Sequence, residues 1–333
     1  MSGASTTPGL ALVTGGAGFI GSNVAVALAA SGWNVRAVDS MDPECGGNRA
    51  NLRGSNARLL ESDLRDQERA NAAVAGASLV VHCAASTSHG RSVREPFADL
   101  DANAAVTLRV LEAVRTHAPT ARVIHLSTTT QSGPLSRVPA DESHPDAPID
   151  VYSSNRLAAE RYAIIYHLVH GLRTTALRLP NVYGPRACLT TPQLTFNNWF
   201  IGCALRNEPI TIWGDGAQLR SIMHVDDAVS AVLAAVACEA SVGQVLLATP
   251  RTPVSVAEFA HATVRAVGSG RVEFTPWPQG RRSIDVGDAV FDPSRAERML
   301  QWSARTPLDA GLRSTAQFFR EHAADYGAAA TRG

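Results

Sequence analysis

Short apolar runs alternate with longer stretches of helical periodicity through the first half of the chain. Each short run has the length of a buried strand, and the stretches between them repeat apolar residues at helical spacing. This alternation is typical of an α/β fold in which a doubly wound parallel sheet is covered by helices. We expect strands at residues 10–14, 34–38, 58–60, 79–82, 122–126 and 174–179, and helices at residues 19–30, 101–117 and 151–170.

The regular alternation ends near residue 180. Pro180, Gly184 and Pro185 interrupt the chain there, and proline and glycine are the strongest local signals of a loop. We therefore expect a first domain over residues 1–180 and a smaller, mixed α/β lobe over residues 181–333 that is intertwined with it. The last residues are small and polar, so we expect a frayed tail.

Charge and apolar content exclude several kinds of partner. The chain has 333 residues and a formal net charge of zero, so it offers no basic field to nucleic acid or to an anionic membrane. Its longest apolar stretches, such as residues 231–237, are far too short to cross a bilayer. Residues 1–9 lack the basic start and apolar core of a secretory signal. We expect neither nucleic acid nor a membrane as a partner.

The cysteines and histidines do not indicate a metal site. The histidines do not cluster with acidic residues at metal-ligating spacing, and C-x-x-C spacing is absent. Scattered cysteines are typical of free thiols in a reducing compartment. We therefore predict a cytoplasmic protein without a metal, whose five cysteines are unpaired: Cys45, Cys83, Cys188, Cys203 and Cys238.

A glycine motif follows the first expected strand and opens the first expected helix. The segment TGGAGFIG places glycines at Gly15, Gly18 and Gly21. The first permits a tight turn, the second lets the backbone approach a pyrophosphate, and the third lets the helix pack on the strand. The amides at the start of the helix can then bind the anion. The motif indicates a Rossmann-like dinucleotide site.

An acidic residue ends the second expected strand and selects between dinucleotides. The Asp39 carboxylate can accept hydrogen bonds from both adenosine ribose hydroxyls, and it would repel a 2′-phosphate. Arg36 lies within the strand and Arg53 lies beyond the expected pocket. The sequence therefore favours NAD over NADP.

Several further motifs occur in the order found in one enzyme family. The chain resembles the extended short-chain dehydrogenases/reductases of the nucleotide-sugar epimerase/dehydratase kind over residues 10–315. The resemblance rests on TGGAGFIG, Asp63-Leu64-Arg65-Asp66, His82-Cys83-Ala84-Ala85, Asn103, Leu126-Ser127-Thr128, Tyr152-x-x-x-Arg156, the stretch from Arg178 to Pro185, and the stretch from Arg220 to Asp227. It implies an NAD-binding first domain and a nucleotide-sugar-binding second lobe. It also implies that NAD is held by Gly15, Gly18, Phe19, Ile20, Gly21, Asp39, Asp63, Leu64, Ala84, Ala85, Tyr152 and Arg156.

The same resemblance implies a catalytic group of three residues: Tyr152, Arg156 and Thr128. Tyr152 would take the proton of a sugar hydroxyl while its carbon passes a hydride to NAD, and Thr128 would hydrogen-bond that hydroxyl. A free tyrosine has a pKa of about 10, so a neighbouring cation is needed to favour its phenolate. A residue four positions further along lies on the same helical face.

Position 156 departs from the family, which has lysine there. Arginine keeps the positive charge and can bind the nicotinamide ribose, but it is effectively never deprotonated and cannot join a proton relay. All thirty basic residues of the chain are arginine, which indicates a general bias against lysine. Three interpretations stay open: a working enzyme with arginine in this role, an enzyme with slowed or altered chemistry, and a non-catalytic nucleotide-sugar binder.

The two residues after Thr128 bear on the reaction. Sugar dehydratases of the family have an acid and a base there, but this chain has Thr129 and Thr130. Elimination needs a proton donor and acceptor beyond Tyr152, so dehydration is disfavoured. We predict an NAD-dependent 4-epimerase acting through a transient 4-keto sugar on a UDP-hexose or UDP-hexuronic acid. A dehydratase with relocated acids, a 4-ketoreductase and a binding protein are the alternatives.

The resemblance also implies a set of substrate contacts. Arginine binds phosphate oxygens through two hydrogen bonds, which suits a diphosphate. The expected substrate residues are Thr128 and Thr129 at the sugar, Asn181, Arg220 and Arg282 at the diphosphate, and Asp285 at the ribose. Asn197 and Asn198 either line the site or lie on a helix surface.

Family members commonly dimerise through the two long helices beside the tyrosine, so we expect a homodimer. The helix surface used for this contact would include Ala158, Ala159, Tyr162, Ala163 and Tyr166.

Overall fold

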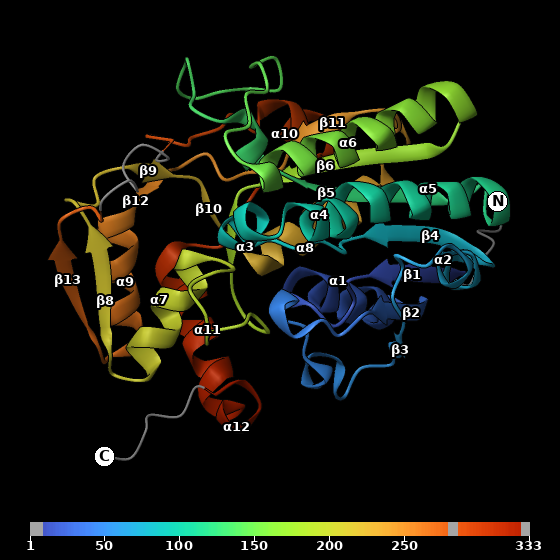
Figure 1. The fold of residues 1–333 in the computed structure, drawn as a ribbon. Helices are drawn as coiled ribbons and strands as arrows, with labels where there is room; N and C mark the ends of the chain where they lie inside the picture. Colours follow the sequence, from blue (N-terminus) through green and yellow to red (C-terminus); the bar gives the residue numbers. More distant parts are fainter. Residues whose placement is uncertain (1–8, 279–285, 328–333) are drawn as a thin grey trace, which may run out of the picture.

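The computed structural model describes residues 9–278 and 286–327. Its centre is a seven-stranded, entirely parallel sheet in the order β11-β6-β5-β4-β1-β2-β3 (Figure 1). The predicted α/β class with a doubly wound parallel sheet is therefore confirmed. The seven strands are β1 (Leu10–Thr14), β2 (Asn34–Asp39), β3 (Arg58–Glu61), β4 (Ala77–His82), β5 (Arg122–Thr128), β6 (Arg173–Leu179) and β11 (Val245–Leu247).

Helices cover both faces of this sheet. On one face α1 (Phe19–Ala30) and α8 (Val225–Ala237) enclose an apolar core with the strands. On the other face α2 (Gln67–Val74), α5 (Val106–His117) and α6 (Val151–His170) enclose a second core. Because both faces are buried, the strands are continuous apolar runs instead of alternating ones.

The strand order reverses beside β1. This strand pairs with β2 on one side and with β4 on the other, so the loops after β1 and β4 leave the sheet toward opposite faces. A crevice forms outside the carboxyl ends of the strands at such a point, and it is the usual ligand site of open α/β sheets. The fold therefore places the glycine motif after β1 at the mouth of a crevice.

Helix α6 begins and ends where the sequence indicates. Asp150 caps its start by accepting a hydrogen bond at Oδ1 from the amide of Ser153 at 2.7 Å. Gly171 ends it in the left-handed conformation, with φ of 71°, which glycine adopts without steric cost. The bounds of α1 and α6 match the prediction, and the caps fix the first turn of α6, which carries Tyr152.

The predicted helix over residues 101–117 needs a correction. The segment Asp101–Ala105 is a π-helical turn that joins α4 (Pro96–Leu100) to α5. Within it, Asn103 donates from Nδ2 to the carbonyls of Ser86 and Asp99, both at 3.1 Å. These bonds tie the turn to the loop after β4, and π-turns are frequent at functional sites.

The second lobe has its own apolar core. It contains α7 (Phe196–Leu205), α9 (Val256–Val267), α11 (Leu308–Glu321), and the parallel pair β8 (Pro209–Trp213) and β13 (Arg271–Thr275) (Figure 1). Its core includes Phe200, Phe259 and Phe319. Because β11 and α8 return from beyond residue 180 to the large sheet, the two lobes interleave, and the division at residue 180 stays a prediction.

The remaining elements are short. The helices are α3 (His89–Arg94), α10 (Ser294–Leu300) and α12 (Ala323–Tyr326), with 3₁₀ turns at Pro43–Cys45, Arg49–Leu52, Thr129–Ser132 and Glu239–Ser241. The strands are β7 (Asn181–Tyr183) paired with β10 (Ile222–His224), and β9 (Leu219–Arg220) paired with β12 (Val254–Ser255). No helix within residues 9–278 and 286–327 has the length and apolar content needed to cross a bilayer.

Candidate active site

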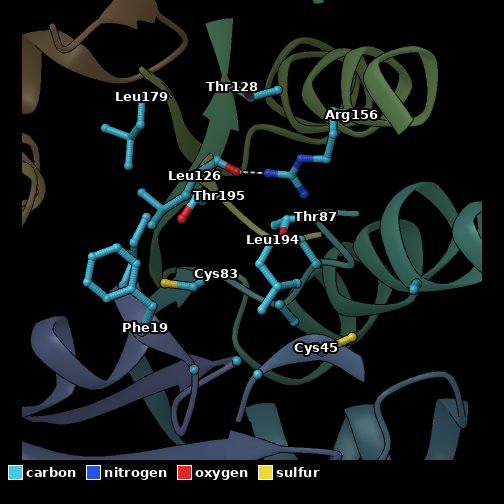
Figure 2. Close-up of a pocket in the computed structure, with 18 of the residues that line it drawn as sticks. Phe19, Cys45, Cys83, Thr87, Leu126, Thr128, Arg156, Leu179, Leu194 and Thr195 are labelled. Carbon is cyan, nitrogen blue, oxygen red and sulfur yellow. Dashed lines mark hydrogen bonds between the residues drawn. The ribbon is translucent and has the colours of Figure 1, made fainter. Parts of the chain in front are cut away.

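A single cavity at the carboxyl edge of the sheet collects most of the predicted site residues. It runs from the loops after β1, β2 and β4 to the end of β5, the start of α6 and the start of β7. Figure 2 shows side chains from both lobes around it. The predicted residues that line it are Gly15, Gly18, Phe19, Ile20, Gly21, Asp39, Asp63, Leu64, Ala84, Ala85, Thr128, Thr129, Tyr152, Arg156 and Asn181.

The glycines of the turn after β1 leave no room for a side chain. A Cβ atom at Gly15, where φ is +63°, would lie 2.9 Å from the Cα of Ala84. A Cβ at Gly21 would lie 2.1 Å from the carbonyl oxygen of Gly15. Both neighbours are backbone atoms that cannot move aside cheaply, so the turn, α1 and the loop after β4 pack as closely as a dinucleotide site requires.

Asp39 faces this turn as the sequence predicts. Its carboxylate accepts hydrogen bonds from the amide of Ala17 at 3.0 Å and from the amide of Met41 at 2.9 Å. Arg36 instead donates to carbonyls of the α2 region, and Arg53 pairs with Asp325. Since neither arginine pairs with the carboxylate, the site keeps an anion where NADP would place its 2′-phosphate.

A buried chain of hydrogen bonds fixes the loop after β4. The hydroxyl of Thr14 accepts from the amide of Ala84 at 3.1 Å and donates to Nδ1 of His82 at 2.7 Å. Nε2 of His82 then donates to Thr107 at 3.0 Å. Burial, with a smaller effect of Arg156, lowers the pKa of His82 to about 3. The imidazole is therefore neutral and keeps this pattern at ordinary pH.

At the opening of the cavity, Asp63 pairs with Arg65. Nη2 of Arg65 lies 2.6 Å from Oδ2 of Asp63, and the resulting hydrogen bonds hold the pKa of the carboxyl below its usual range. The pair lies beside Leu64, whose side chain is buried. This side of the cavity is thus polar but nearly neutral.

Tyr152 and Arg156 lie one helical turn apart on α6 and both line the cavity. They are 6% and 4% exposed, so the guanidinium does not extend into solvent. Figure 2 shows Arg156 reaching from α6 into the pocket, with Nη2 donating to the carbonyl of Leu126. Its Nε and Nη1 are buried without a partner among the described residues. Buried donors are normally satisfied, so these two nitrogens would suit the hydroxyl oxygens of a bound dinucleotide ribose.

The pKa of Tyr152 corrects one expectation. Burial raises the pKa of the phenol, while the charge of Arg156 and a hydrogen bond with Thr128 act in the opposite direction. The net direction of the pKa is upward because burial is the largest effect, and the negative charges of Asp150 and Asp99 add to it. The cation therefore acts as predicted, but it does not by itself ionise the phenol in the cofactor-free protein.

Thr128 ends β5 beside the tyrosine and also caps the following turn. Its hydroxyl oxygen accepts from the amide of Thr130 at 3.2 Å and lies 3.2 Å from the Thr130 hydroxyl. The structure thus shows the capping role of Thr128, and its substrate-binding role stays a prediction. Thr129 is buried in the cavity wall. Because residues 129 and 130 are both threonine, neither position after Thr128 carries an ionisable side chain.

A buried ionic network supports this end of β5 from behind. Glu160 of α6 accepts from Ser127 at 2.7 Å and from Gln131 at 2.7 Å. Arg178 of β6 donates to Glu160 at 2.6 Å and to Asp146 at 3.0 Å. The bonds of Glu160 join α6 to β5, to the turn after β5 and to β6, so Thr128 and Tyr152 are held on one support.

On the second lobe, asparagines position the wall opposite α6. Asn181 lines the cavity at the start of β7. Asn197 and Asn198 are buried, and each donates from Nδ2 to the carbonyl of Val182, at 2.9 and 3.1 Å. Neither lies on a helix surface, and Asn198 lines the cavity.

Of the two predicted diphosphate arginines, the structure places only Arg220, and it does not line this cavity. Arg220 belongs to β9 and donates to the carbonyls of Leu219 and Gly287, and it is absent from the cavity lining. Arg282 and Asp285 lie outside the described residues. Their roles stay predictions.

Two side chains in the cavity wall were not identified from the sequence. His89 lies edge-on to the ring of Tyr152, with 4.8 Å between the ring centroids, and its Nδ1 is 2.5 Å from Oδ2 of Asp150. Thr195 lies at the start of α7 and also lines the cavity. Neither belongs to a recognisable motif, because α3 and α7 meet α6 and β7 only in the folded chain. Among the described residues, no three His, Cys, Asp or Glu side chains group as metal ligands.

Comparison with known proteins identifies the class. Residues 11–246 match the model of the NAD dependent epimerase/dehydratase family, and the chain belongs to this family. The UDP-glucose 4-epimerase of Mycolicibacterium smegmatis is 30% identical over 93% of this chain and 98% of its own length.

Two solved structures extend the similarity to the whole fold. The UDP-glucose 4-epimerase of Thermotoga maritima, solved with UDP-glucose, has a TM-score of 0.86 and 30% identity over 94% of this chain and 99% of its own. MoeE5, solved with UDP-glucuronic acid and NAD, has a TM-score of 0.80 and 30% identity over the same shares.

The cofactor of this enzyme is NAD. The family is NAD-dependent, and solved neighbours of this fold contain NAD. The cavity fits that cofactor in three places: the close-packed glycine turn, the Asp39 carboxylate, and the unpartnered donors of Arg156. When bound, NAD would supply a hydride acceptor at its nicotinamide ring.

Proposed function

We propose that this enzyme interconverts the 4-epimers of a nucleotide-diphosphate sugar through a transient 4-keto intermediate. One observation carries the proposal: Tyr152, Arg156 and Thr128 meet in one cavity with the glycine turn, whereas the two residues after Thr128 cannot ionise. This arrangement supports reversible oxidation of a hydroxyl and offers no acid and base at the positions where elimination would need them.

The residues of the chain divide the work of the oxidation. Thr128 and Tyr152 bind the reacting hydroxyl, and Tyr152 takes its proton as the hydride leaves the carbon. Arg156 stabilises the phenolate form that receives the proton, and its buried guanidinium orients the cofactor ribose. After the keto sugar rotates, return of the hydride to the other face and of the proton from Tyr152 gives the epimer.

The sugar-facing wall supports a neutral or an acidic hexose linked to UDP. The Thr128–Thr130 hydroxyls are hydrogen-bond donors and acceptors that suit either a 6-hydroxyl or a 6-carboxylate. MoeE5, with a similar fold, was solved with UDP-glucuronic acid and also with UDP-glucose. We therefore propose a UDP-hexose or a UDP-hexuronic acid as substrate.

Incubation of the purified enzyme with a set of nucleotide sugars tests the function. UDP-glucose, UDP-glucuronate and dTDP-glucose are offered without added cofactor, and NMR determines the product configuration. We expect the 4-epimer of a UDP-sugar and NAD retained through purification. A 4-keto-6-deoxy product would instead establish a dehydratase, and a strict need for added NADH or NADPH would establish a reductase.

Tyr152→Phe separates an enzyme from a binding protein. The substitution removes only the phenolic oxygen, so the enzyme is expected to lose epimerisation while keeping its affinity for UDP-sugar by calorimetry. A parent protein that binds UDP-sugar but converts none of the sugars would support the binding interpretation.

We further propose a homodimer built on the outer faces of α5 and α6. The surface differs from the predicted one, because Ala159, Ala163 and Tyr166 are buried within the protomer. The exposed apolar residues of these helices are Leu108, Ile165, Leu168 and Val169. Sedimentation of the parent protein is expected to give a dimer, and sedimentation of Leu168→Glu is expected to give a monomer.

The free state of all five cysteines supports the cytoplasmic location expected from the sequence.

A further inference from the structure

Because residue 156 is arginine, the side chain next to Tyr152 on α6 cannot pass the proton of the phenol on to solvent. A guanidinium is never deprotonated in proteins, so it cannot take over a proton as a lysine could. Tyr152 is 6% exposed and does not face bulk water. The site thus needs another group if the phenol is to equilibrate with solvent.

His89 lies where such a group is needed. Its ring meets the ring of Tyr152 at 71°, with centroids 4.8 Å apart, and it lines the same cavity. Its side chain is 49% exposed. The imidazole therefore contacts the buried phenol on one side and solvent on the other.

Asp150 orients this imidazole. Its Oδ1 is fixed by the amide of Ser153, and its Oδ2 lies 2.5 Å from Nδ1 of His89. Burial opposes ionisation of Asp150, but His89 and Ser153 together hold the pKa of the carboxyl below its usual value. An ionised Asp150 makes Nδ1 the protonated nitrogen of His89 and leaves Nε2 to exchange protons. A base held by a carboxylate in this way is a recurring catalytic arrangement.

We propose that His89, oriented by Asp150, is a second acid–base residue that passes the Tyr152 proton to and from solvent. The inference rests on the proposed oxidation of a sugar hydroxyl. As the hydride leaves the substrate carbon, the hydroxyl proton moves to Tyr152 and then to Nε2 of His89, directly or through one water. The imidazolium charge is balanced by Asp150, and the proton returns by the same path when the ketone is reduced.

The charged groups around His89 are consistent with this role. Tyr152 of α6 and Asp150 at its cap are the titratable groups whose contacts with His89 the structure shows. The next basic residue of α3, Arg91, is paired with Asp42, Glu44 and Glu95. Asp150 is thus the acid in contact with the imidazole.

His89→Gln tests the assignment, with the exposed His117→Gln as the matched control. Substrate is mixed with the NAD-loaded enzyme, and the first reduction of cofactor is followed by its near-ultraviolet absorbance across a range of pH. We expect the parent rate to rise with pH, because the reaction releases a proton that leaves Tyr152 through His89. In His89→Gln this rise is lost and the rate falls about 100-fold, while UDP-sugar affinity is unchanged. His117→Gln keeps the parent profile.

A spectroscopic readout does not depend on turnover. Nitrogen NMR of the parent is expected to show the Nδ1–H tautomer of His89, and Asp150→Asn, which still caps α6, is expected to lose that preference. An unchanged pH profile in His89→Gln, or a rate reduced equally at every pH, would overturn the assignment. If the parent neither reduces its cofactor nor forms an epimer with any nucleotide sugar, the proposed function itself fails, and the relay with it.

Discussion

The guanidinium of Arg156 donates a hydrogen bond from Nη2 to the carbonyl of Leu126. Leu126 belongs to β5, two residues before Thr128, so this bond ties the catalytic face of α6 to the strand that carries the threonine. Its Nε and Nη1 are buried and have no partner within residues 9–278 and 286–327. Arg156 is therefore anchored in the protein at one nitrogen, and the other two are available for a ligand.

Two substitutions of Arg156 separate the effect of its charge from the effect of its shape. Arg156→Lys keeps a cation beside Tyr152, so we expect kcat within about tenfold of the parent, whereas Arg156→Met is expected to lose at least about 100-fold and to bind NAD more weakly. Steady-state epimerisation and NAD titration measure both effects. Arg115→Met, a change on the exposed side of α5, is the control. Full activity of Arg156→Met would contradict the assigned role.

Asp39→Asn is expected to weaken NAD binding. The amide keeps the shape of the carboxylate but loses its charge, and hydrogen bonds to a charged group contribute about 1.5–3 kcal/mol. Calorimetry of the cofactor-free protein is expected to show about 10- to 100-fold lower NAD affinity and a smaller preference over NADP. Glu61→Gln on the neighbouring strand, where Glu61 pairs with the exposed Arg49, should leave both unchanged.

Gly21→Ala tests the close packing of the glycine turn. The added methyl group would lie 2.1 Å from the carbonyl oxygen of Gly15, so we expect a loss of about 3 kcal/mol of stability and of NAD binding. The control is Gly90→Ala in α3, where the nearest atom to the new methyl group is Nη1 of Arg94 at 3.5 Å. Urea unfolding measures both. Equal stability of the two variants would show that the turn can open without cost.

Acid is expected to destabilise the protein through His82. Burial lowers its pKa from 6.5 to about 3, so between these values the unfolded chain binds a proton that the folded protein does not. The free energy of unfolding therefore falls as pH falls below 6.5, by about 2 kcal/mol at about pH 5 from this residue alone. This loss of stability continues to grow as the pH falls, until the pH reaches the His82 pKa of about 3 in the folded protein.

His82→Gln removes this titration. We expect the variant to be less stable at neutral pH, by about 1 kcal/mol for a lost hydrogen bond, but to lose less stability on acidification than the parent. Urea unfolding at several pH values compares the slopes, and the exposed His117→Gln should follow the parent. Parallel curves for His82→Gln and the parent would mean that His82 titrates normally in the folded state.

Local patterns were enough to predict the elements that carry the site. The apolar run before Gly15 and the helical spacing of Tyr152 and Arg156 depend on neighbours in sequence, and the structure places them as expected. The helix over residues 101–117 was predicted less well, since its π-helical start depends on Asn103 reaching the loop after β4.

Whether a single side chain can carry a charge could also be predicted from the sequence, because it depends on the residue type. The side chain of Arg156 is cationic at any pH, and Thr129 and Thr130 can never ionise, so these limits on the reaction were set before any fold was known. By contrast, whether Arg156 turns inward could be decided only by the packing of α6 against β5.

The sequence by itself determined the α/β class and the dinucleotide turn, because each depends on residues close together in the chain, and it supplied the candidates for the reacting side chains. The tertiary structure decided the balance of charge and burial at Tyr152 and brought His89 and Asn198 to the cavity. Burial and contacts between distant segments arise only when α3, α6 and α7 pack together, and no local pattern records them.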